Sequence, residues 1–273
     1  MNIKKRRVIK AQVTVFVILA IVLVVAGGIA YYNVNNSKIN NDFFSGADIK
    51  PTVDNIKSSI IGCQENTIKD SLENIGIQGG YYNKPEKYLD AGPIFIPYYY
   101  YEEKLFVPNN AKVQSELSNS INDGIARCID NIEISDFEIS HKTPKTTALI
   151  SKGEVKITID LPVIIKKETN IITLEMKDLP VIEKSKLYES LEVAKVIVES
   201  HKTNPEYFCL NCVSNLTEEN GLYVVALSLN NSLLYIIASN STQDKNYYFE
   251  FLDKYSPGKA ETFNVPNAPV ENK

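Results

Sequence analysis

The chain has 273 residues, a formal net charge of −4 and 44% hydrophobic residues. This length suits one membrane anchor plus one domain of ordinary size, or two small domains. The mild acidity argues against a nucleic-acid-binding protein, so we expect no nucleic acid among the partners.

The first predicted element is a transmembrane helix over residues 13–32, a stretch without any charge. At about 1.5 Å per helical residue it can cross a ~30 Å hydrocarbon core. Five cations precede it: Lys4, Lys5, Arg6, Arg7 and Lys10. The positive-inside bias then predicts a single-pass protein of the cell membrane, with a cytoplasmic N-terminus and an extracytoplasmic C-terminal domain. A cleaved signal peptide is the alternative, with residues 28–30 as its candidate cleavage site.

Five segments follow from this anchor. We expect a cytoplasmic basic stub (1–12), the transmembrane helix acting as a signal-anchor (13–32), a linker rich in Asn and Ser (33–50), an extracytoplasmic α+β head (51–255) and a disordered tail (256–273). The predicted fold class is α+β, with amphipathic helices packed on antiparallel hairpin and meander sheets.

Two amphipathic helices are expected at the start of the head, over residues 51–75 and from Asn109 or Asn110 to residue 132. Each has a cysteine on its apolar stripe, Cys63 in the first and Cys128 in the second. The segment between them, dense in Gly, Pro and Tyr, should form short extended pieces and turns.

From about residue 137 the apolar period changes from helical to two. Residues 155–165 and 172–176 predict a hairpin with one solvated face, joined by a turn at 166–170. Pro162 lies inside the first strand, which implies an edge position or a bulge there.

The last predicted elements are a helix over residues 183–202, a short helix from the Asn204-Pro205 pair to about residue 221, and a three-stranded meander. The meander strands are 222–229, 233–238 and 247–252.

Four cysteines form an even set, which outside the cytoplasm favours disulfide bonds. Helix packing favours pairing Cys63 with Cys128, which leaves Cys209 to pair with Cys212. The first bond would close a long loop, and the chain-entropy formula assigns such a loop about 4 kcal/mol.

Two functional hypotheses also apply to Cys209 and Cys212, a redox dithiol and a zinc site. A redox dithiol of this spacing normally sits at a helix N-terminus after a strand, whereas here the pair is predicted one turn inside a helix. A zinc site would need His201 and a fourth ligand such as His141, Cys63 or Cys128. We therefore expect a structural bridge, with no metal and no cofactor.

Catalytic motifs are absent from the sequence: it contains no GxSxG, P-loop, HExxH or GxGxxG. Neither His141 nor His201 lies near an evident nucleophile, and the Glu102-Glu103 pair is typical of solvated charge. We expect no enzymatic activity.

The tyrosines gather between the first two predicted helices. They either cover the helices as core and rim or form an interaction surface, because tyrosine supplies rigid amphipathic contact area. A ligand-binding head would require an apolar pocket beside them. The candidate surface consists of Tyr81, Tyr82, Tyr98, Tyr99, Tyr100 and Tyr101.

The start of the chain resembles the archaeal class III, prepilin-like signal, through Lys10-Ala11-Gln12-Val13-Thr14-Val15-Phe16. That family usually carries Glu where this sequence has Phe16. The resemblance implies a pilin-like filament subunit that is processed after Ala11.

More of the chain resembles uncharacterised single-pass membrane proteins of small-genome archaea of the DPANN type. The resemblance rests on the Gln-Val-Thr-Val-Phe start, Gln78-Gly79-Gly80-Tyr81, Pro97-Tyr98-Tyr99-Tyr100, Cys128 and the Cys209/Cys212 pair. It implies the same topology and no activity.

Together these features predict a membrane-anchored, extracytoplasmic structural or interaction module of the archaeal cell envelope. Its expected partners are the lipid bilayer and unknown envelope proteins. The alternatives are the pilin-like subunit and an envelope thiol-disulfide oxidoreductase using Cys209 and Cys212.

Overall fold

The computed structural model describes residues 53–175, 180–203, 209–229, 231–239 and 246–254, all in the unit that begins at Val53. The side chains of residues 201–203 are not described. The predicted stub, transmembrane helix, linker and tail, and with them Phe16, lie outside these residues. In the described part of the chain, none of the helices has the length and apolar character to cross a membrane.

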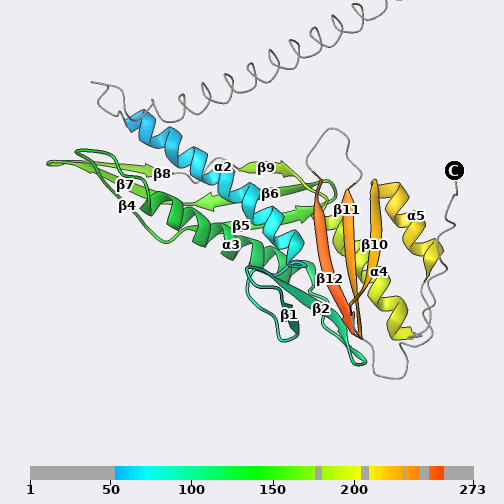
Figure 1. Ribbon diagram of the computed structural model, residues 1–273. Helices are drawn as coiled ribbons and strands as arrows, with labels where there is room; N and C mark the ends of the chain where they lie inside the picture. Colours follow the sequence, from blue (N-terminus) through cyan, green and yellow to red (C-terminus); the bar gives the residue numbers. More distant parts are fainter. Residues whose placement is uncertain (1–52, 176–179, 204–208, 230, 240–245, 255–273) are drawn as a thin grey trace, which may run out of the picture. The chain divides into compact units, whose positions relative to one another are not determined.

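Helices α2 (Val53–Ile77) and α3 (Asn110–Asp130) run antiparallel, side by side (Figure 1). The predicted apolar stripes are confirmed, because both helices bury a row of isoleucine, leucine and valine side chains at three- and four-residue spacing. Asn109 is the N-cap of α3, as predicted, and its side chain accepts a hydrogen bond from the Lys112 N–H. The helix ends differ from the prediction by about two residues.

Two three-stranded antiparallel sheets follow α3. One has the order β4-β7-β8 and the other β5-β6-β9. Their strands are β4 (Glu138–His141), β5 (Lys145–Ser151), β6 (Glu154–Asp160), β7 (Pro162–Lys167), β8 (Asn170–Glu175) and β9 (Val181–Lys184). The strands alternate between the sheets in pairs along the chain: β4 and β5, β6 and β7, and β8 and β9. Each pair contributes one strand to the first sheet and one to the second. The predicted hairpin is confirmed in part: β7 pairs with β8, but residues 155–160 of the predicted first strand belong to β6 in the other sheet.

Pro162 does not mark an edge strand or a bulge, so that prediction is wrong. It is the first residue of β7, the central strand of its sheet, separated from β6 only by Leu161. The first residue of a strand is a position that tolerates the missing N–H. Its carbonyl accepts a hydrogen bond from the Lys142 N–H at 3.1 Å. The proline thus divides one long segment between two sheets.

A six-stranded sheet contains the predicted meander and also the tyrosine-rich segment. Its order is β1-β2-β12-β11-β10, with β3 pairing to β2. The strands are β1 (Tyr88–Asp90), β2 (Phe95–Tyr101), β3 (Lys104–Leu105), β10 (Leu222–Leu229), β11 (Ser232–Ser239) and β12 (Tyr248–Lys254). Strands β2 and β12 pair in parallel, which joins the start of the head to its end.

Helix α4 (Leu187–Thr203) begins four residues later than predicted, because Val181–Lys184 pairs with β6 as strand β9. Its predicted apolar side is confirmed, since Leu187 and Leu191 are among its fully buried residues. Helix α5 (Leu210–Asn220) ends at Gly221, whose φ of 62° forms a left-handed cap. Figure 1 shows α4 and α5 beside strands β10–β12.

The hydrophobic core is one continuous cluster that includes side chains of the four described helices and of the sheets. At its centre Tyr99 stacks on Phe251, with ring centroids 4.7 Å apart, and Phe251 stacks on Tyr235 at 5.1 Å. Gly79, with φ of 53°, lies so close to β12 that an added Cβ would be 2.5 Å from the Glu250 carbonyl oxygen. The α+β class is therefore confirmed for the described head.

Candidate functional site

The first disulfide joins Cys63 of α2 to Cys128 of α3, as predicted, with Cα atoms 5.8 Å apart. Successive contacts continue along the helix pair. Thr67 lies against Gly124, and the Ser120 hydroxyl donates to the Ser71 hydroxyl at 3.0 Å. Each contact is four residues further along α2 and four residues back along α3. The bond therefore belongs to a regular antiparallel packing seam that holds the two helices together.

The second disulfide joins Cys209 to Cys212, also as predicted, but its position in the fold differs from the prediction. Cys209 is the N-cap of α5, not a residue one turn inside a helix, and its sulfur accepts a hydrogen bond from the Cys212 N–H at 3.3 Å. Cys212 is exposed and Cys209 is half-buried. The predicted helix start at Asn204-Pro205 lies outside the described residues; within them α5 begins at Leu210, after its cap Cys209.

This position has a chemical consequence. The N-terminus of a helix carries partial positive charge, which stabilises a thiolate and makes it a better leaving group. The geometric objection to a redox role, that the pair lies inside a helix, is thereby removed. The bond closes only a short loop, so it adds little to the connection between elements.

A zinc site at Cys209 and Cys212 is not formed by the described residues, and the side chain of His201 lies outside them. The sulfurs of Cys209 and Cys212 are bonded to each other, so neither is a thiolate. His141 contacts the Asp130 carboxylate at 3.2 Å and the Lys142 carbonyl oxygen at 2.8 Å. Within the described ranges, no three His, Cys, Asp or Glu side chains are grouped to hold a metal ion.

The six tyrosines of the candidate surface divide into two groups. Tyr81, Tyr99 and Tyr100 are buried, so the structure places them in the core and not on a surface. Tyr82, Tyr98 and Tyr101 are half-buried at the rim. The three buried residues contribute to core packing. Only the three half-buried residues could contribute to a binding surface.

Hydrogen bonds explain how tyrosine is accommodated in this core. The Tyr99 hydroxyl donates to the Gly79 carbonyl at 2.8 Å, and the Tyr81 hydroxyl donates to the Phe106 carbonyl at 3.0 Å. Burial, with a smaller effect of the nearby Glu116 carboxylate, raises the pKa of Tyr81 to about 12. Both phenols therefore remain neutral donors that fasten the loop after α2.

Glu116 of α3 anchors that loop from the other side. Only 2% exposed, it accepts hydrogen bonds from the backbone N–H groups of Tyr82 and Asn83, at 3.0 and 2.8 Å, and pairs with Lys112 at 2.7 Å. Burial acts to raise the pKa of Glu116, but the hydrogen bonds from Lys112 and the loop outweigh it and lower the pKa. The carboxylate is thus a structural acceptor held in its charged form.

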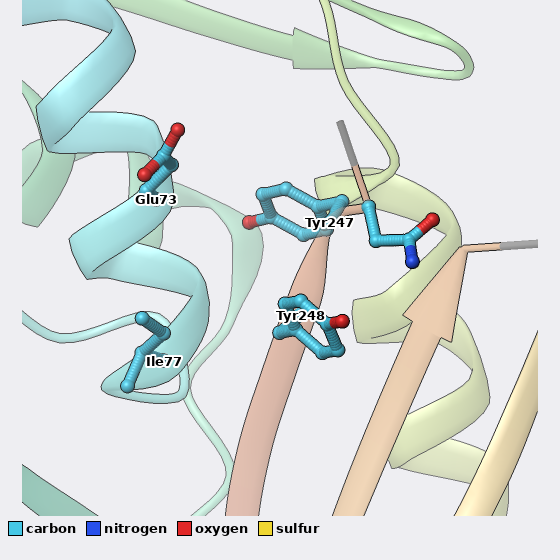
Figure 2. Close-up of a pocket in the computed structure, with 5 residues that line it drawn as sticks. Glu73, Ile77, Tyr247 and Tyr248 are labelled. Atoms are coloured by element: carbon cyan, nitrogen blue, oxygen red, sulfur yellow. The ribbon is translucent and has the colours of Figure 1, made fainter. Parts of the chain in front are cut away.

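A concavity of about 390 Å³ lies between the end of α2 and the start of β12 (Figure 2). Glu73 and Ile77 line it from α2, and Tyr247 and Tyr248 line it from the other side, together with Asn246. None of its lining residues belongs to the tyrosine-rich segment. It is therefore not the apolar pocket that a ligand-binding head was expected to have there.

An apolar surface that sequence reasoning missed lies on the six-stranded sheet. Strand β10 points four alternate side chains to one face, and all four are exposed: Tyr223 (43%), Val225 (39%), Leu227 (48%) and Leu229 (39%). We call this side of the β10–β11–β12 strands the outer face. A solvated face of an antiparallel sheet normally carries polar side chains.

The outer face continues across the neighbouring strands. Residues directly opposite one another share a face, and the register places Leu234 opposite Leu227 and Ile236 opposite Val225. Both are half-buried, and Tyr248 of β12 is 42% exposed on the same face, whereas Ala238 of β11 and Leu252 of β12, also on this side, are fully buried. Glu250 is the acidic residue here, opposite Ile236, and burial raises its pKa. Such an apolar patch is typical of a surface that contacts another molecule.

The sequence of β10 contains a signal for this surface. Strand β10 reads Leu-Tyr-Val-Val-Ala-Leu-Ser-Leu, apolar at the positions of both faces. Such a run usually predicts a strand buried on both sides. In the structure only Leu222 of β10 is buried, and residues 225–229 are exposed on both faces of the strand among the described residues.

Comparison with known proteins adds no identification: no family model, curated protein or solved structure matches the chain. The disulfides and the outer face are therefore interpreted from their geometry alone.

Proposed function

We propose that this protein is a membrane-anchored, extracytoplasmic interaction module of the cell envelope, and that the outer face of strands β10–β12 is its binding surface. The observation that carries the proposal is the exposed apolar row on β10. The uncharged stretch at residues 13–32 and its preceding cations support the anchoring. Two disulfides support an oxidising compartment.

Site-specific photo-cross-linking in native membranes tests the binding surface. A photoreactive residue in place of Leu227 should give a discrete cross-linked product. The matched control is Leu149 of β5, which is 55% exposed and lies opposite Lys156 and beside Thr147. Equal labelling from both positions, or no product from Leu227, would reject the outer face as a binding surface.

The topology is tested separately. Protease added to intact cells should digest the head while residues 1–12 stay protected. Protection of the head would reject the extracytoplasmic placement, whatever the outer face binds.

A second candidate function is thiol-disulfide exchange at Cys209 and Cys212, favoured by their place at the exposed start of α5. A thiolate of a substrate dithiol would attack the exposed Cys212 sulfur, break the disulfide and release Cys209 as a thiolate. The second substrate thiolate would then resolve the mixed disulfide. Two electrons and two protons pass from the substrate dithiol, which becomes a disulfide, to the two cysteines.

Exchange is tested by adding a reduced dithiol peptide to the oxidised protein, alkylating free thiols and locating them by mass spectrometry. Labelled Cys209 and Cys212 together with oxidised peptide support the reaction. Peptide that stays reduced while the pair stays closed dismisses it. Labelling of Cys63 and Cys128 at the same rate would show general reduction instead of a specific site.

A further inference from the structure

The outward edge of β10, which pairs with no strand in the described ranges, differs from the other strand edges of the head. Edge strands with unpaired backbone groups can pair with another chain, and proteins normally block them with charge, proline or a covering segment. All the other edge strands in the described ranges carry a charged residue: Asp90 in β1, Lys104 in β3, Glu138 in β4, Lys145 in β5, Glu175 in β8 and Glu183 in β9. Strand β10 has neither charge nor proline over eight residues.

Strand β5 shows how this fold covers an edge. Its Thr146 N–H donates to the Asn122 side chain at 2.9 Å, and its Ile150 N–H donates to the Gln114 side chain at 3.0 Å. Both acceptors lie on α3, so the helix satisfies two of the outward N–H groups of that edge. Strand β10 pairs with β11 alone among the described strands.

We propose that β10 pairs with β10 of a second copy of this chain, antiparallel about a two-fold axis at Ala226. This inference rests on the proposed function: it names a second copy of the chain as the partner at the edge of β10, the strand that carries the exposed row of the outer face. Residues opposite one another must share a face, so odd-numbered residues of one copy must face odd-numbered residues of the other. An axis at Ala226 satisfies this condition.

The side-chain pairing on the outer face is favourable in this register. Tyr223 lies opposite Leu229 of the second copy and Val225 opposite its Leu227, and the two-fold axis repeats both pairs. Aromatic–aliphatic and aliphatic cross-strand pairs of this kind stabilise sheets. Strand β10 has no charged residue, so two copies do not repel each other, and the apolar residues of its outer face lie opposite apolar residues of the second copy. An isologous interface requires such self-complementarity.

The expected interface is modest. One strand edge with four partly exposed side chains is smaller than the roughly 800 Å² per partner of stable complexes. Dimerisation should therefore be reversible in detergent and favoured where anchoring in one membrane raises the local concentration.

Cysteine cross-linking of the full chain, in membranes and in micelles under mild oxidation, tests both partner and register. Ala226→Cys should give a covalent homodimer, because directly opposite Cα atoms lie about 4.5–5.5 Å apart, within disulfide range. Val224→Cys and Ser228→Cys alone should not, since each is displaced from its own copy by about four residues, or roughly 13 Å. Mixing these two variants should restore a heterodimer.

The outcomes separate the inference from the proposed function. Homodimers of Val224→Cys as abundant as those of Ala226→Cys would indicate random collision and overturn the pairing. A cross-link from Ala226→Cys to a different polypeptide would overturn the second copy as partner but keep the binding surface. No product, together with no photo-cross-link at Leu227, would overturn both.

A charge on the edge gives an independent check. Leu227→Lys should abolish the Ala226→Cys dimer, whereas Leu149→Lys should leave it unchanged. Both positions are exposed, so both variants should fold with unchanged circular dichroism. Persistence of the dimer in Leu227→Lys would contradict the proposed pairing.

Discussion

The α2–α3 pair and the α5–β10 region each contain one disulfide, but the two bonds constrain the chain very differently. Cys63 and Cys128 are 65 residues apart in sequence, and Cys63 lies on the buried seam of the helix pair. Cys209 and Cys212 are three residues apart, and Cys212 is exposed. The first region is fastened internally, whereas the second presents both its disulfide and its apolar strand to the outside.

The largest expected effect is the loss of the long-range bond. The double variant Cys63→Ala/Cys128→Ala should lower the free energy of unfolding by about 4 kcal/mol, because the unfolded chain regains the entropy of a 65-residue loop. At about 2–4 °C per kcal/mol for a domain of this size, Tm should fall by about 8–16 °C in calorimetry. A decrease in the free energy of unfolding of less than about 1 kcal/mol would mean that the Cys63–Cys128 bond stabilises the protein no more than the Cys209–Cys212 bond.

Glu116 should make the next largest contribution to the stability of the α2–α3 pair and the loop after α2. Glu116→Ala should cost about 3 kcal/mol in urea unfolding at pH 7, because buried N–H donors of Tyr82 and Asn83 lose a charged acceptor.

The pH dependence of this effect has a definite sign. The pKa of Glu116 is lower in the folded than in the unfolded protein, so its stabilisation is present above the unfolded pKa, about 4.5, and is lost as pH falls through the folded pKa. The stability difference from Glu116→Gln should therefore shrink below about pH 4.5. A difference independent of pH would show that the charge is not involved.

The close approach of the helices gives a smaller prediction with a matched control. A Cβ at Gly124 would lie 2.5 Å from Cγ2 of Thr67, whose branched side chain is stiff, so Gly124→Ala should destabilise by about 1–2 kcal/mol. Gly62→Ala, in α2 with open space around it, should instead stabilise by about 0.5–1 kcal/mol. Adding Thr67→Ala should recover most of the Gly124→Ala loss in the double variant.

The smallest effect is expected at the exposed disulfide. Cys209→Ser/Cys212→Ser should change the free energy of unfolding by about 1 kcal/mol or less, because the bond closes a very short loop and serine is a good N-cap. Chemical denaturation measures this directly. A loss comparable to that of the Cys63–Cys128 variant would mean that α5 is fastened as strongly as α2 and α3.

Local and periodic features of the head were predictable from sequence. The stripes of α2 and α3 follow from apolar spacing, and those stripes place Cys63 and Cys128 within reach of each other. The Asn109 cap follows from side-chain chemistry. These predictions succeed because a helix buries its stripe whatever the rest of the fold does.

Other features depend on contacts distant in sequence. The parallel pairing of β2 with β12 joins residues about 150 positions apart, and no local pattern encodes it. Residues 183 and 184 belong to β9 because β6 offers them a partner, which overrides their helical pattern. Pro205 predicted the start of α5, but the helix is capped by Cys209. The exposure of Tyr223 and Leu227 depends on which elements cover β10, which the sequence of the strand does not specify.

The order of the cysteines along the chain has a consequence for biosynthesis. Both bonds connect cysteines that are consecutive in sequence, Cys63 with Cys128 and then Cys209 with Cys212. If the head crosses the membrane from its N-terminal side, Cys128 is the first partner that Cys63 meets, and the second pair arrives only after the first can close. Native connectivity thus coincides with the order of emergence, and oxidation during export reaches it without any exchange of partners.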